Sequence, residues 1–279
     1  MPSNGATPGR QFAFTEDHFQ AVRTLVGEHA GIHLAEAKRD MVYGRLVRRL
    51  RALKLSSFDA YLAQLQQDGG ELVHFVNALT TNLTSFFREP HHFEFLADEL
   101  VPELVRRRGD RRLRVWSAGC STGEEPYSIA MVLKESVPAG WDVRILATDL
   151  DSNVVATAER GVYDLDRVRN LGRRRLERWF LKGKGANTGT VRAKDELRAM
   201  IRFRQLNLLA DWPMRGPLDL IFCRNVVIYF AKETQRRLFD RYANILAADG
   251  HLFLGHSESL FKVSDRFRLL GNTVYQKIA

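Results

Sequence analysis

The spacing of hydrophobic and polar positions divides the chain into two parts that meet near residue 80. In the first part, apolar residues recur at the intervals of an amphipathic helix. Three helices are expected there, over residues 15–31, 35–55 and 57–67. Thr15 ahead of two acidic residues is typical of a helix N-terminus, and Gly31 of a helix end. The pattern predicts a small all-α N-terminal domain over residues 11–80.

From about Phe93, helical spacing alternates with short apolar runs. Helices are expected over residues 94–108, 126–137, 152–163 and 232–246. Strands are expected over residues 112–119, 142–151, 218–230, 250–259 and 269–279. Strands separated by helices predict an α/β domain with a doubly wound, mostly parallel sheet, over residues 93–279. Such a sheet binds ligands at the carboxyl ends of its strands, and residues 81–92 form the linker before it.

The alternation breaks between Leu165 and Leu209. A short helix and three strand-like runs follow one another there, and the Gly-rich turn "GKGANTG" joins two of the runs. Because such turns are typical of hairpins, we expect a small antiparallel β insertion over about residues 168–208.

Composition excludes several classes of protein. The two cysteines, Cys120 and Cys223, lie in apolar segments without metal-ligand spacing, so neither a disulfide framework nor a metal site is expected and both are interpreted as core residues. No apolar run reaches the length of a signal peptide or a membrane span. The sequence therefore predicts a soluble, cytoplasmic protein.

The net charge of +9 predicts attraction to an acidic partner. Part of this charge is concentrated on the segment 41–55, where the basic side chains lie off the apolar stripe: Arg45, Arg48, Arg49, Arg51 and Lys54. No acidic residue follows Asp40 within the segment, so these cations are expected to lack local partners. A solvated charged face is the alternative, and an acidic partner explains the pattern better.

The segment "SAGCSTGEEP" follows the first expected strand and precedes a helix, as a nucleotide-binding turn would. It carries two glutamates and no lysine, and the next strand ends at Asp149, where an acidic residue holds ribose hydroxyls in dinucleotide folds. A pyrophosphate would be repelled. The pattern favours a ligand with a ribose and a positive or zwitterionic part, which describes S-adenosylmethionine. A capping box between Thr122 and Glu125 is the structural alternative.

Six blocks in order along the chain resemble the chemotaxis-receptor methyltransferases, the CheR family. These blocks are "TTNLTSFFREPHHF", "WSAGCSTGEEPYSIA", "ATDLD", "QLNLL", "FCRNVVIYF" and "GHSES". The resemblance runs from about Phe14 to the C-terminus. It implies transfer of a methyl group from S-adenosyl-L-methionine to glutamate side chains on the cytoplasmic helices of bacterial chemoreceptors, with S-adenosyl-L-homocysteine as product, in sensory adaptation during chemotaxis.

The resemblance also implies a set of cofactor contacts, which are Asn82, Thr84, Arg88, Glu125, Asp149, Asn207, Leu208, Asn225 and Val226. Asp149 is assigned to the ribose, Asn207 with Leu208 to the adenine, and Asn225 with Val226 to the methionine portion. Glu125 is assigned to the amino-acid end of the cofactor or to a nearby polar group. Three alternatives stay open at this point: Asn82 and Thr84 as caps of the following helix, Asn207 as a turn residue, and Glu124 in place of Glu125.

Methyl transfer to a carboxylate needs alignment and exclusion of water rather than a general base, because glutamate with a pKa of about 4.3 is already ionised at neutral pH. Arg88 is the expected orienting residue for the substrate carboxylate. Tyr229 is expected to line the methyl path, with a core aromatic as its alternative. His91 and His92 are interpreted as structural residues because no base is required.

Two contacts with the receptor are expected. The arginines of segment 41–55 are expected to lie along the acidic substrate helices. The inserted sheet resembles the version that binds a receptor C-terminal peptide by strand addition in part of the family, with Lys182 and Arg192 near acidic groups of that tail. A plain hairpin turn is the alternative for this segment. The protein is expected to be a monomer.

Two other functions are less well supported. A nucleic-acid methyltransferase would suit the basic charge, but "CRNVVIYF" contains neither the Pro-Pro segment nor the Pro-Cys nucleophile of base-modifying enzymes, and no aromatic residues alternate with the arginines. A non-catalytic binding module with this fold would be expected to have lost the cofactor acids or Arg88, and all of them are present.

Overall fold

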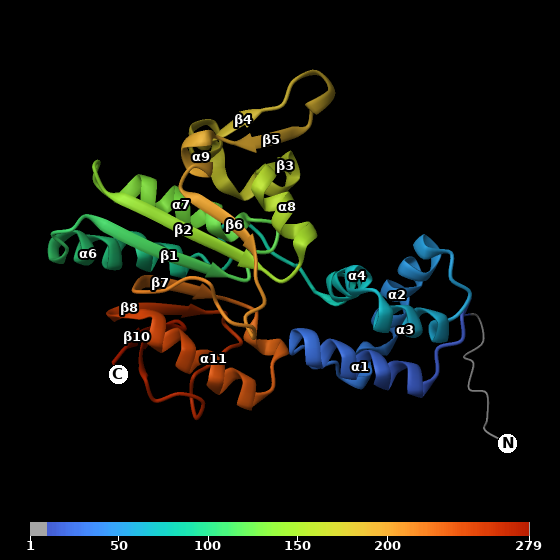
Figure 1. Cartoon of the computed structure of the whole chain (residues 1–279). Helices are drawn as coiled ribbons and strands as arrows, with labels where there is room; N and C mark the ends of the chain where they lie inside the picture. Colours follow the sequence, from blue (N-terminus) through green and yellow to red (C-terminus); the bar gives the residue numbers. More distant parts are fainter. Residues whose placement is uncertain (1–9, 279) are drawn as a thin grey trace. The chain divides into compact units, whose positions relative to one another are not determined.

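The computed structural model describes residues 10–278, which form two compact units (Figure 1). The first unit contains the residues up to Thr81 together with Tyr229–Ala231. The second contains Asn82–Ile228 and the residues from Lys232 on. Most of the expected polar tail and the last residue of the expected final strand lie outside the described residues.

The first unit is all-α, as predicted. Its elements are α1 (Glu16–Ala30), the short 3₁₀ helix η1 (Glu36–Lys38), α2 (Arg39–Leu53), α3 (Phe58–Gln67) and α4 (Gly69–Leu79). The Thr15 hydroxyl accepts a hydrogen bond from the His18 amide, and Gly31 ends α1 in the left-handed region at φ 67°. Helix α4 was not predicted separately, because Gly69 and Gly70 resemble the end of α3. Asp68 starts it by accepting from the amides of Gly70 and Glu71.

The large sheet of the second unit confirms the doubly wound prediction. Its strands are β1 (Arg112–Ala118), β2 (Asp142–Asp149), β6 (Ile201–Gln205), β7 (Leu218–Cys223), β8 (Leu246–Leu254), β9 (Phe267–Gly271) and β10 (Val274–Lys277). Their order is β6-β2-β1-β7-β8-β10-β9. The first five are parallel, and β10 runs antiparallel to β8 and β9. The single strand predicted over residues 269–279 was wrong, because the chain reverses at Asn272 and Thr273 to form a hairpin.

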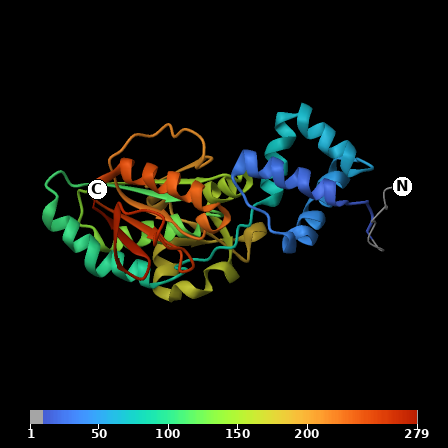
Figure 2. The same ribbon diagram turned by 90° about the horizontal axis from the view of Figure 1, so that it is seen from below.

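Helices cover both faces of this sheet. The helical segment α5 (His91–Phe95), η2 (Leu96–Leu100) and α6 (Val101–Arg107) precedes β1, and α7 (Glu124–Ser136), α8 (Ser152–Arg160) and α11 (Lys232–Ile245) follow β1, β2 and β7. Successive side chains of β1 point to opposite faces. Trp116 packs against Tyr242 of α11 at 5.4 Å between ring centroids, whereas the Ser117 hydroxyl donates to Glu125 of α7. Figure 2 shows α11 along one face.

A second, three-stranded antiparallel sheet has the order β3-β5-β4, with β3 (Val162–Asp164), β4 (Phe180–Lys182) and β5 (Thr190–Ala193). Between and after these strands lie η3 (Leu165–Leu171), α9 (Gly172–Trp179), η4 (Gly185–Asn187) and α10 (Asp195–Arg198). The predicted insertion over residues 168–208 was misplaced at both ends. Residues 162–164 form a strand instead of the end of a helix, and β6 belongs to the large sheet, where it pairs with β2.

No helix among residues 10–278 is both long enough and apolar enough to cross a membrane.

Candidate functional site

Three loops meet at the carboxyl ends of β1 and its neighbours β2 and β7. The turn after β1 begins at Gly119, where φ is +116° and a Cβ atom would lie 2.3 Å from Cγ2 of Val226, in the loop after β7. Only glycine allows this approach. The amides of Gly119 and Cys120 donate to the Thr148 carbonyl of β2, both at 2.8 Å. The turn after β1 is therefore packed closely against both β2 and the loop after β7.

Asp149 is fixed at the end of β2 by two backbone amides. Its carboxylate accepts from the Ser121 amide at 2.8 Å and from the Asp151 amide at 3.0 Å. Burial raises the pKa of Asp149 to about 6, although these hydrogen bonds act in the opposite direction. The side chain is thus oriented before any ligand arrives, as a ribose-binding carboxylate should be.

The two glutamates that start α7 have different partners. Glu125 accepts from the Ser117 hydroxyl at 2.6 Å and pairs with Arg224 at 3.1 Å. Burial raises the pKa of Glu125, and the charge of Arg224 opposes that shift. Glu124 is fully buried and accepts from the Thr122 hydroxyl at 2.6 Å and from Arg167. The capping-box alternative was wrong, because Gly123 is the N-cap residue of α7 and no side chain caps it.

The linker residues contact the same loops. The side-chain amide of Asn82 donates to the Asp151 carboxylate at 2.8 Å. The backbone carbonyl of Asn82 accepts from the Ser121 hydroxyl at 3.1 Å. Arg88 donates to the Leu83 carbonyl at 2.8 Å. The next helix begins only at His91, so the alternative in which Asn82 and Thr84 cap it was wrong. Thr84 is half-buried in the same non-helical segment.

Asn207 and Leu208 follow β6. The Asn207 side chain accepts from the Leu209 amide at 2.9 Å, so this asparagine shapes its own turn, as its structural alternative predicted. Leu208 is buried, and its carbonyl accepts from Arg241 at 2.8 Å and from Trp212 at 3.1 Å. Their role toward adenine stays a prediction.

Glu258, in the "GHSES" block, organises the loop after β7 and had no role assigned from the sequence. It is 4% exposed, and burial raises its pKa. Its carboxylate accepts from the backbone amides of Asn225, Val226 and Val227, each at 2.8 Å, and of Gly255 at 2.6 Å. This one side chain fixes the backbone of both residues that the resemblance assigns to the methionine portion of the cofactor.

Arg224 was also missed, and it joins three segments of the site. Its guanidinium is 2% exposed, pairs with Glu89 and with Glu125 at 3.1 Å each, and donates to the Arg88 carbonyl. Although burial acts to raise the pKa of Glu89, the hydrogen bond from His256 and the charge of Arg224 hold it at about 2. The acidic loop after β1 had suggested a site rich in negative charge, but a buried cation compensates one of its two glutamates.

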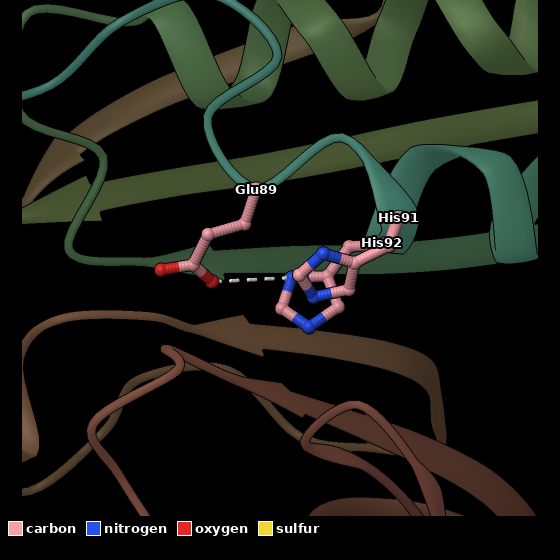
Figure 3. Close-up of side chains that lie close together, drawn as sticks. All are labelled: Glu89, His91 and His92. Atoms are coloured by element: carbon pink, nitrogen blue, oxygen red, sulfur yellow. Dashed lines mark ion pairs between the residues drawn. The ribbon is translucent and has the colours of Figure 1, made fainter.

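Glu89, His91 and His92 form a group with the donor types of a metal site (Figure 3). The Glu89 carboxylate points toward Nδ1 of His92 at 3.5 Å. Burial lowers the pKa of His92 to about 4, and its Nε2 lies 2.8 Å from the Asn272 carbonyl. Arg224 pairs with Glu89 at 3.1 Å, and Nε2 of His92 has the Asn272 carbonyl as its partner, so both side chains are held by contacts within the protein.

Comparison with known proteins gives the family of this chain. Residues 17–80 match the CheR methyltransferase all-alpha domain, and residues 82–276 match the CheR methyltransferase SAM binding domain. The chain belongs to the CheR methyltransferase family. It is therefore a methyltransferase that depends on S-adenosylmethionine.

Several chemotaxis protein methyltransferases are similar over almost the whole CheR chain. Chemotaxis protein methyltransferase 2 of Pseudomonas aeruginosa is 48% identical over 281 residues, which cover 99% of this chain and 99% of that protein. The chemotaxis protein methyltransferase of Escherichia coli is 46% identical over 271 residues, which cover 95% of this chain and 92% of that protein.

Tyr229 of this CheR chain belongs to the first compact unit and not to the unit that contains the loops above. It ends the short 3₁₀ helix η5 (Val227–Tyr229), and its carbonyl accepts from the His33 amide at 2.9 Å. Its role at the methyl path stays a prediction. Cys120 and Cys223 are buried, and burial raises the pKa of both thiols, which agrees with their interpretation as core residues.

The arginines of α2 differ in their partners and in their exposure. Arg49 pairs with the buried Glu71 at 2.5 Å, Arg45 donates to the carbonyl groups at the end of α4, and Arg51 donates to Gln11. These partners lie outside the segment 41–55, so the inference that cations without local acids are free was wrong for Arg45, Arg49 and Arg51. Arg48 is exposed. Contact of all four with a substrate helix stays a prediction. Contact with a receptor tail stays a prediction for Lys182 on β4 and for Arg192, which lies 3.6 Å from Asp195.

Replacing Arg49 with alanine is expected to destabilise the helical unit, whereas Arg48→Ala is expected to leave its stability unchanged. Glu71 is 3% exposed at its side chain and also accepts from Tyr61 at 2.9 Å, so loss of Arg49 leaves a buried carboxylate without its cation. The expected loss is about 2–4 kcal/mol, less than for a fully buried pair because Arg49 itself is partly exposed. Urea unfolding followed by circular dichroism measures it, and equal stability of the two variants would contradict the assignment.

Proposed function

We propose that this CheR protein transfers the methyl group of S-adenosyl-L-methionine to glutamate side chains on the cytoplasmic helices of chemoreceptors and so forms methyl esters. The observation that carries the proposal is the fixed carboxylate of Asp149, set between the ends of β1 and β2 beside a turn with two glutamates. A carboxylate acceptor at the end of the second strand suits the hydroxyl groups of a ribose, and the turn offers no lysine to a pyrophosphate. The names of its relatives supply the link to chemotaxis.

The residues present fit the cofactor. Asp149 would hold the ribose, the loop fixed by Glu258 would hold the methionine portion through Asn225 and Val226, and Glu125 would act near its amino-acid end. When bound, S-adenosylmethionine supplies an electrophilic methyl group on a sulfonium ion.

The protein's own contribution is alignment and charge complementarity. The substrate carboxylate is ionised at neutral pH, so no residue has to remove a proton. Arg88 would orient that carboxylate by a charge-assisted hydrogen bond. Its backbone is already fixed, because its carbonyl accepts from the buried Arg224. Its guanidinium is held by the Leu83 carbonyl at 2.8 Å, and a side chain held in this way can align a substrate at little further entropic cost.

Two basic regions favour an acidic receptor as substrate. Arg48 is exposed on α2, where it would steer acidic helices by long-range attraction. Lys182 lies on β4, an outer strand of the small sheet that can accept a further strand from a receptor tail. Product release would yield S-adenosyl-L-homocysteine, which is expected to inhibit because it differs from the cofactor by one methyl group and one charge.

Transfer of a labelled methyl group to a purified chemoreceptor cytoplasmic fragment tests this function. We expect alkali-labile label on the wild-type fragment and little on a fragment whose methylation-site glutamates are replaced by alanine. The variant Arg88→Gln is expected to lower kcat/KM about 100-fold, since a lost charged hydrogen bond costs roughly 1.5–3 kcal/mol and misalignment adds to it. Label on DNA or RNA instead, with none on the receptor, would favour a nucleic-acid methyltransferase.

A further inference from the structure

Glu124 is a buried carboxylate whose cation comes from the inserted segment, residues 162–193, which contains the three-stranded sheet. Its side chain is 0% exposed, whereas its partner Arg167, on η3, is 42% exposed. The only other hydrogen bond described for this carboxylate comes from the Thr122 hydroxyl at 2.6 Å. A buried carboxylate is strongly destabilised when its cation is removed, so the turn after β1 depends on a residue more than forty positions away.

Two further contacts join the inserted segment to the same site. The Tyr163 hydroxyl of β3 donates to the Thr122 carbonyl at 2.9 Å, and a Cβ atom at Gly123 would lie 2.7 Å from that hydroxyl. The Asn170 side chain donates to the Phe86 carbonyl of the linker at 2.6 Å. Phe86 in turn packs edge-on against Tyr163 at 5.0 Å. The inserted segment is thus bound to both the turn and the linker.

We propose that Arg167 is a positioning residue for the cofactor. It acts through Glu124: by compensating this buried charge, it holds the turn of residues 119–125 in the conformation that presents the Ser121 amide to Asp149 and Glu125 to Arg224. The inserted segment is then part of the cofactor site and not only a platform for a receptor tail. This inference rests on the proposed function.

Titration calorimetry with S-adenosyl-L-homocysteine tests the proposal on the full chain. We expect Arg167→Gln to weaken binding roughly 10- to 100-fold, the usual range of coupling between linked sites. Arg167→Lys keeps the charge and is expected to recover much of the affinity. Arg169→Gln is the matched control, because Arg169 lies on the same η3 and its ionic partner among residues 10–278 is the exposed Asp166. It is expected to bind as the wild type does.

The double variant Glu124→Gln with Arg167→Gln separates positioning from a direct contact. A neutral glutamine in place of Glu124 needs no cation and can still accept from Thr122, so the double variant is expected to bind more tightly than Arg167→Gln alone. The proposal is overturned if folded Arg167→Gln binds like the wild type. It is also overturned if Glu124→Gln alone is as weak as Arg167→Gln and the double variant recovers nothing, since Glu124 would then be a direct ligand. Failure of the wild type to bind would instead overturn the cofactor assignment, and this inference with it.

Discussion

Asp149→Asn is expected to weaken S-adenosyl-L-homocysteine binding by about 100-fold or more, because hydrogen bonds to a charged acceptor contribute roughly 1.5–3 kcal/mol each and a ribose offers two donors. Asparagine keeps the size of the side chain but replaces one hydrogen-bond acceptor with a donor. The native carboxylate accepts from two backbone amides, and an NH₂ group placed against either of them would oppose donor to donor. Titration calorimetry of the folded variant measures the loss.

The pH dependence of binding provides an independent check on Asp149. Burial raises the pKa of this carboxyl to about 6, so below that pH it becomes protonated and loses one acceptor. The ionised form is the one expected to bind the ribose. Affinity should therefore be constant well above pH 6 and fall as the pH drops through 6. Asp149→Asn should lack this dependence. Asp166→Asn, at an exposed position, should retain it. An affinity of the wild type that stays constant down to pH 5 would contradict the role.

The site residues that the sequence could indicate are those fixed by the chain's own order. Asp149 ends an apolar run, and the two glutamates follow another, so a parallel sheet must place them at neighbouring strand ends. Arg224 and Glu258 could not be assigned in this way. Their importance comes from burial and from partners on other segments of the chain, and no local pattern in the sequence encodes those contacts.

The misplaced elements have a related cause. The run "IRFRQ" alternates apolar and polar residues, which predicts a half-buried strand but not the sheet to which it belongs. It forms the edge of the large sheet, where Ile201 and Phe203 are buried and the arginines between and after them are exposed. Likewise, Arg49 of α2 seemed unpaired because its partner Glu71 lies on another helix. A sequence does not show which residues, distant along the chain, become partners in the folded protein.

Replacing Arg224 with methionine is expected to destabilise the second unit by about 3–5 kcal/mol, the usual cost of removing one partner from a buried ion pair. The reason is that two acidic side chains, Glu89 and Glu125, would lose the cation they share; each is only 10% exposed at its side chain. The Arg88 backbone would also lose its donor. Guanidinium unfolding of the full chain, followed by tryptophan fluorescence, measures the change, because Trp116 is buried in β1 of this unit.

Comparison of two further variants shows whether charge is the cause. Arg236→Gln removes an arginine that is 53% exposed and pairs with an exposed glutamate on α11, so its effect should stay within about 0.5 kcal/mol. The triple variant Arg224→Met, Glu89→Gln and Glu125→Gln leaves no buried charge in this cluster and should be more stable than Arg224→Met alone. If the triple variant is instead the less stable of the two, Arg224 stabilises the site chiefly through packing and through its hydrogen bond to Arg88, and the carboxylates tolerate burial without it.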